Sequence, residues 1–155
     1  MTSAYLVTEH DSDLTLLRKL LPPALVLELV FYATNGRSSV YSAAGTLLSD
    51  RQRPVVIVVD AETQNAAEIQ EKISLANTLL LPAAPLGVPF QVLLAVPTIA
   101  SILKSDPTIQ SSLYSPSDLY KVLERLTSSQ IIALQQNPLI QQLIEFFSNV
   151  TRQIA

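Results

Sequence analysis

The sequence predicts an α/β fold with an open, parallel four-stranded sheet flanked by helices and a helical C-terminal extension. Three observations support this prediction. Short apolar runs alternate with helical patterns as far as about residue 105, which is typical of parallel sheets with helical crossovers. One run, VVIVV at 55–59, is apolar at every position, as expected of a strand covered on both faces. Beyond Pro97 the pattern becomes helical only.

The elements of the first part follow one another with clear boundaries. Apolar runs predict strands at 4–8, 25–33, 55–59 and 90–96. The first helix starts at Asp11 or Ser12, residue types that cap free backbone N–H groups, and ends before Pro22. The second starts at Ser38 or Ser39 and reaches about 48, and the third runs from Thr63 or Asn65 to about 81.

The last third of the chain predicts three helices. Ser115 and Pro116 suit the start of the first, the second covers about 128–136, and Asn137-Pro138 begins the third. The third helix carries an apolar stripe, for which packing on the sheet is the favoured interpretation and binding of a partner protein the alternative. We therefore expect one domain over 1–155, with an α/β core at 1–105 and a helical extension at 106–155.

Composition narrows the classes of function. Hydrophobic residues make up 48% of the chain and charged residues 15%, which excludes an intrinsically disordered protein. Ten Lys and Arg against a net charge of −3 do not favour a protein that wraps duplex DNA. With no cysteine and one histidine, thiolate and multi-histidine metal sites are excluded. The remaining chemistry depends mainly on carboxylates.

The chain from Ile73 to Leu103 lacks charged residues but is not expected to cross a membrane. Four prolines interrupt it, and each would remove a hydrogen bond from a helix. The segment is better explained as a helix end, a loop, a buried strand and the next helix. The first residues show no secretory signal pattern, so a cytoplasmic protein is expected.

Acidic residues follow two of the predicted strands. Glu9 and Asp13 come after the first strand, and Asp60 and Glu62 directly after the third. An extended strand end points residues two apart the same way, and neighbouring first and third strands would place Glu9 opposite that pair. Carboxylates gathered there repel one another unless a cation lies between them, and Mg²⁺ or Mn²⁺ suits oxygen ligands. Capping of the following helices is the alternative explanation.

These motifs resemble the TOPRIM domain, the metal-binding module of topoisomerases, primases and nucleases of the OLD (overcoming lysogenization defect) family. The resemblance covers about 4–105. LVTEHDSDLTLLRKLL is similar to the first motif, NGRSS to the turn after the second strand, VVIVVDAET to the Asp-x-Asp motif, and AVPTIASIL to the segment after the fourth strand of OLD-like members. His10 stands where the family has Gly, and Glu62 replaces the second Asp.

The resemblance implies metal-dependent phosphoryl transfer on nucleic acid, with Mg²⁺ or Mn²⁺ as cofactor. Asp60 and Glu62 are implied metal ligands, Asp13 a ligand for a second ion, and Glu9 the general acid or base. Arg37 and Lys104 are candidate phosphate contacts, with a solvated surface charge as the alternative for each.

Two other functions stay open. The missing Gly and the altered Asp-x-Asp motif fit a catalytically altered TOPRIM-like interaction or regulatory subunit, with a protein partner at the C-terminal helices. A receiver-like signalling domain would use the acidic pocket to accept phosphate at Asp60, but no Lys directly follows the fourth predicted strand. The pattern leaves the oligomeric state open.

Overall fold

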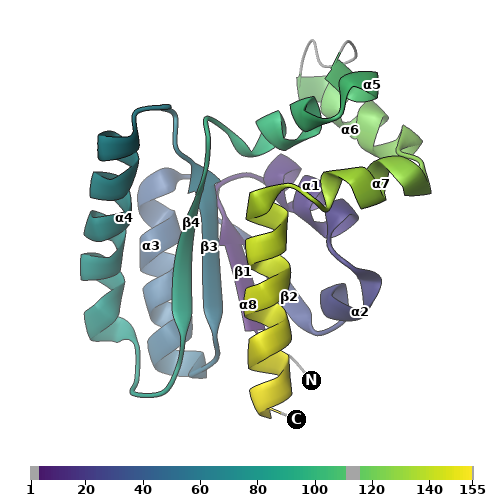
Figure 1. The fold of residues 1–155 in the computed structure, drawn as a ribbon. Helices are drawn as coiled ribbons and strands as arrows, with labels where there is room; N and C mark the ends of the chain where they lie inside the picture. Colours follow the sequence, from purple (N-terminus) through teal and green to yellow (C-terminus); the bar gives the residue numbers. More distant parts are fainter. Residues whose placement is uncertain (1–3, 111–115, 155) are drawn as a thin grey trace.

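The chain folds into three layers, with a parallel sheet between two layers of helices, as the computed structural model in Figure 1 shows. The structure describes residues 4–110 and 116–154. The four strands lie in the order β2-β1-β3-β4, so that β1 and β3 are neighbours at the centre. The predicted fold class is confirmed. The strands are β1 (Ala4–Thr8), β2 (Leu29–Ala33), β3 (Val55–Asp60) and β4 (Phe90–Ala95).

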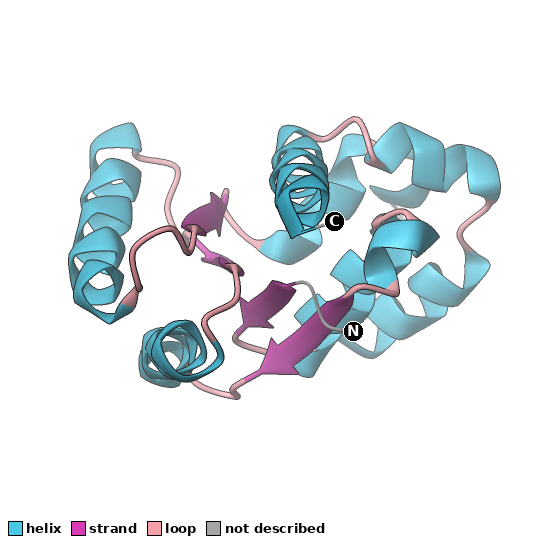
Figure 2. Cartoon of the chain, turned by 90° about the horizontal axis from the view of Figure 1, so that it is seen from below, coloured by secondary structure: helices cyan, strands magenta, loops and turns pink. Residues whose placement is uncertain are grey.

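Helices cover both faces of the sheet, as the view along the strands in Figure 2 shows. The odd-numbered residues of β3 pack in one apolar cluster and the even-numbered ones in the other, so the strand is buried on both sides as predicted. One face is covered by α3 (Arg37–Thr46) and α4 (Ala66–Leu80), and the other by α1 (Asp11–Leu20) and α8 (Pro138–Ile154).

The remaining elements are short turns of helix and a helical layer at one end. They are α2 (Pro23–Val26), the π-helical turn η1 (Leu47–Arg51), and the 3-10 helices η2 (Leu81–Ala83) and η3 (Ile99–Ser105), followed by α5 (Pro107–Gln110), α6 (Pro116–Arg125) and α7 (Ser128–Leu134).

One predicted boundary and one predicted helix cap are wrong for local reasons. The strand predicted at 25–33 begins only at Leu29, because Pro23 starts a helical turn in which the Pro22 carbonyl accepts hydrogen bonds from Leu25 and Val26. The first helix begins at Asp11, but its N-cap is His10, whose side chain makes no capping bond. Ser115, the expected cap of α6, lies outside the described residues.

The C-terminal helix belongs to the main core. Its stripe is buried in the same apolar cluster as α1 and the even-numbered residues of β3, which confirms packing on the sheet. The buried members are Ile140, Leu143, Phe147 and Val150. The segment from 73 to 103 is helix, loop, strand and 3-10 helix, as predicted. Within the described ranges no helix is long and apolar enough to cross a membrane.

The strand order creates one point of divergence in the sheet. From β1 the chain passes through α1 to β2 on one side, and from β3 it passes through α4 to β4 on the other. Because α1 and α4 lie on opposite faces, the loops that follow β1 and β3 separate between them. Open α/β sheets bind ligands in the crevice at such a point, outside the carboxyl ends of the strands.

Candidate functional site

The end of β1 places Glu9 and His10 at the carboxyl edge of the sheet. Thr8 is fully buried, the Glu9 side chain is 15% exposed, and the His10 side chain is 55% exposed. Glu9 Oε1 and His10 Nε2 lie 3.8 Å apart. Glu9 is therefore mostly buried, with the more exposed imidazole of His10 beside it.

Asp13 is the buried acid of the site. It lies in the first turn of α1, only 9% exposed, and burial raises the pKa of its carboxyl from 3.8 to about 6. The negative charges of Asp60 and, to a smaller extent, Glu9 raise this pKa further, whereas the imidazole of His10 and a hydrogen bond from the His10 backbone lower it. Asp13 thus takes part in capping α1, and its pKa is also raised by the carboxylates of Glu9 and Asp60.

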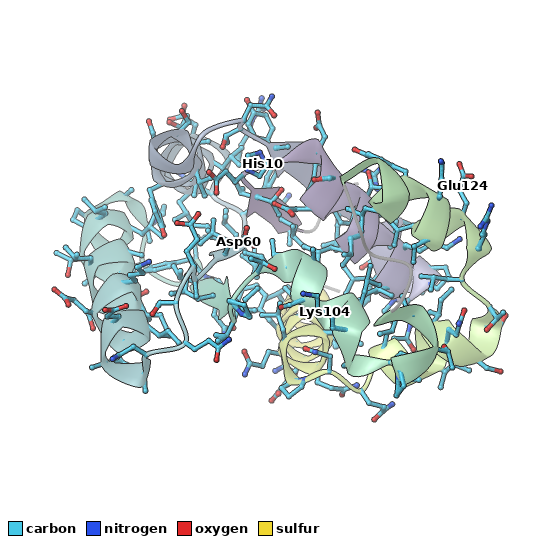
Figure 3. All side chains as sticks on the ribbon, turned by 90° about the horizontal axis from the view of Figure 1, so that it is seen from above. His10, Asp60, Lys104 and Glu124 are labelled. Carbon is cyan, nitrogen blue, oxygen red and sulfur yellow. The ribbon has the colours of Figure 1, made fainter. Side chains whose placement is uncertain are left out.

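Asp60 ends β3 beside the first residue of η3. Its Oδ1 accepts a hydrogen bond of 2.6 Å from the backbone N–H of Ile99. This bond links β3 to the segment that follows β4 and fixes one carboxylate oxygen. Figure 3 looks onto this edge and shows Asp60 at its centre with His10 close by.

Glu62 does not continue the extended strand. Its φ is +59°, in the left-handed region, and its backbone N–H donates to the Pro97 carbonyl at 2.8 Å. The expectation that Asp60 and Glu62 point the same way from an extended strand end is therefore wrong. Glu62 is exposed, and it is not among the charges that shift the pKa of Asp13.

The two candidate phosphate contacts come from η3 and from the start of α3. Lys104 is exposed near the end of η3, and Figure 3 shows it to one side of Asp60. Arg37 is the first residue of α3, next to the turn after β2, and its side chain lies outside the described part of the chain.

Sequence reasoning missed the backbone groups that organise this edge. The N–H of Asn35, a residue with φ +59°, donates to the Glu9 carbonyl at 2.7 Å, and the Thr34 N–H donates to the Thr8 carbonyl. These bonds tie the turn after β2 to the end of β1. The Asn-Gly pair in the sequence was the signal for that turn, since Asn tolerates a left-handed backbone.

The donor set is suited to a hard cation in an open site. Across residues 4–110 and 116–154, no group of three or more His, Asp or Glu side chains is arranged to hold a metal ion. One or two carboxylates, with water and a substrate phosphate, are the usual protein contribution to Mg²⁺ binding. The Asp13 and Asp60 carboxylates, whose negative charges repel each other, fit that smaller contribution. The described residues do not provide a site in which protein ligands alone surround the ion.

Comparisons with known proteins add no family to this geometry. No family model matches the chain, and no match was found among characterised proteins or among solved structures. The functional argument therefore depends on the site itself.

Proposed function

We propose that the chain binds a divalent metal ion, Mg²⁺ or Mn²⁺, at the carboxyl ends of β1 and β3 and acts in phosphoryl transfer on nucleic acid. The observation that supports this most is the pairing of β1 with β3, which brings Glu9, directly after β1, and Asp60, at the end of β3, to one edge of the sheet. Asp13, buried in the first turn of α1, has its pKa raised by the charges of both. The three carboxylates lie where the strand order favours a ligand.

In this proposal Asp60 and Asp13 are the metal ligands and Glu9 is the general acid or base. Glu62 is left out because its left-handed backbone turns away from the strand direction. The bound ion supplies positive charge for a phosphate and for the transition state. Glu9, mostly buried beside His10, would exchange a proton with the reacting oxygen, and the exposed imidazole would pass that proton to solvent.

Metal titration by calorimetry tests this proposal. Wild type is expected to bind Mn²⁺, and Asp60→Asn to weaken binding at least about tenfold while its circular dichroism spectrum stays unchanged. Asp50→Asn, which removes an exposed carboxylate in η1 at the other end of the molecule, is the control and should bind like wild type. Equal binding by wild type and Asp60→Asn, or none by wild type at millimolar metal, would contradict the site.

Cleavage assays then test the reaction. With Mn²⁺ or Mg²⁺, wild type is expected to cut plasmid or single-stranded DNA, and Asp60→Asn and Glu9→Gln to lose that activity. The catalytically altered subunit remains the second candidate, since the described residues offer no three-ligand metal group and Glu62 leaves the strand. It predicts no cutting by wild type and a reproducible protein partner. Phosphate uptake at Asp60 from a small phosphodonor would instead support a receiver-like function.

A further inference from the structure

An apolar groove opens beside Asp60, on the face of the sheet that α3 and α4 cover. Its volume is about 280 Å³, at the small end for ligand sites. Asp60 is itself one of the lining residues, so the groove and the proposed metal site are contiguous. The wall residues used below are Tyr41 from α3, Lys72, Leu75 and Leu79 from α4, and Leu94 from β4.

The α4 wall presents two largely exposed leucines to water. Leu75 and Leu79 are 60% and 62% exposed, and the spacing of 72, 75 and 79 places them on one helix face with Lys72. Covering such side chains with a flat apolar group is favourable in proportion to the area removed from water. Half-buried Tyr41 adds an aromatic ring from the facing helix.

The polar end of the groove carries a fixed positive charge. Lys72 Nζ donates to the Ala61 carbonyl at 2.6 Å, which holds the ammonium at the end of β3. An ammonium has three N–H donors, so this bond leaves it able to contact a phosphate. Figure 3 shows α4 on the side of Asp60 away from Lys104 and Glu124.

We propose that this groove takes up one unstacked base of a single-stranded nucleic acid whose phosphate lies at the carboxyl edge. The inference builds on the proposed function and names the form of its substrate. Single strands are bound without sequence preference by aromatic side chains on which bases stack, next to positive charge along the backbone. Here Tyr41 supplies the ring, the α4 leucines add apolar area, and Lys72 supplies the charge. The size favours a single ring system over a docked protein helix, which needs anchors along several turns.

Fluorescence anisotropy with two labelled probes tests the groove. The probes are an oligothymidylate of about eight nucleotides and an abasic chain with the same number of phosphates. Wild type is expected to bind the first about tenfold more tightly. Leu79→Asn should bring that ratio close to one. Leu81→Asn, which changes a leucine that is 68% exposed and lies outside the groove, should keep it.

Measuring the ratio in EDTA and again with Ca²⁺ separates this inference from the metal site. A ratio near one in wild type that binds Mn²⁺ normally would overturn the base pocket and leave the metal proposal standing. A high ratio in EDTA that Leu79→Asn abolishes would support the pocket even where Mn²⁺ fails to bind. If Leu79→Asn instead turns a dimer into a monomer and leaves the ratio unchanged, the groove is a protein interface and the base pocket is wrong.

Discussion

Asp13 shows how single residues accommodate the repulsion among carboxylates at the site. A bound cation would relieve this repulsion, and so does a proton. With the pKa of Asp13 raised to about 6, the buried carboxyl is neutral in mildly acidic solution, which removes one of the opposing charges. In the proposed function, a proton and a metal ion would therefore compete for the same negatively charged site.

The raised pKa predicts that Asp13 costs stability at neutral pH in a metal-free buffer. The folded state keeps its proton up to about pH 6 and the unfolded chain loses it near 3.8, so stability falls as pH rises through that window and levels off above it. Asp13→Asn removes this dependence. In EDTA it should match wild type near pH 4 and be more stable by roughly 1–2 kcal/mol at pH 7.

Urea unfolding at a series of pH values measures that difference. Asp11→Asn, an exposed acid in the same helical turn, is the control and should track wild type at every pH. A stability difference between wild type and Asp13→Asn that does not change with pH would show that folding does not shift the pKa of this carboxyl.

The bond from Ile99 to Asp60 gives a second prediction for a single residue. Asp60→Ala removes the acceptor of a buried backbone N–H and should cost about 1–3 kcal/mol, whereas Asp60→Asn keeps an oxygen acceptor and should cost less. Urea unfolding in EDTA separates this structural role from metal binding. Equal losses in the two variants would mean that the hydrogen bond contributes nothing measurable.

At the level of elements, periodicity predicted most of the fold and failed where backbone geometry decides. The β3 strand could be predicted because its all-apolar run reflects burial on both faces. The cap of α4 could be predicted because Asn65 makes a local hydrogen bond to the helix. The left-handed Glu62 was not readable, because its conformation depends on the Pro97 carbonyl, far along the chain. The same holds for the bond between Asp60 and Ile99, which spans 39 residues.

The contribution of α8 to the core gives a prediction at this scale. Phe147 is fully buried against residues of the α/β part, so Phe147→Ala should cost about 3–5 kcal/mol. Glu145→Ala, an exposed change on the same helix, should stay within about 0.5 kcal/mol of wild type. Thermal unfolding in one cooperative step for both variants is expected. A second, separate transition that Phe147→Ala alone shifts would show that the helices fold as an independent extension.

At the level of the whole molecule, the strand order brings together acidic residues whose local positions alone do not indicate a site. In their own segments Glu9 follows a strand, Asp60 ends one, and Asp13 lies in the first turn of a helix, where acids are favourable. Only the pairing of β1 with β3 brings them to one edge of the sheet. The amino-acid sequence does not reveal which strands pair, so this juxtaposition could be predicted only on the assumption that the first and third strands are neighbours. The negative potential at this edge is therefore a product of topology.

In the proposed site a proton and a metal ion compete for the Asp13 carboxylate, which predicts that the affinity for the metal depends on pH. Because a metal ligand must be deprotonated, Mn²⁺ binding should release the proton of Asp13 below pH 6, and the affinity should rise with pH, approaching tenfold per unit well below 6, and level off above it. Calorimetry in buffers of different ionisation enthalpy counts the released protons. Asp13→Asn should bind more weakly at pH 7 and lose most of this rise. A wild-type affinity that stays constant from pH 5 to 7 would mean that the ion is held without Asp13, by the carboxylates of the two strand ends alone.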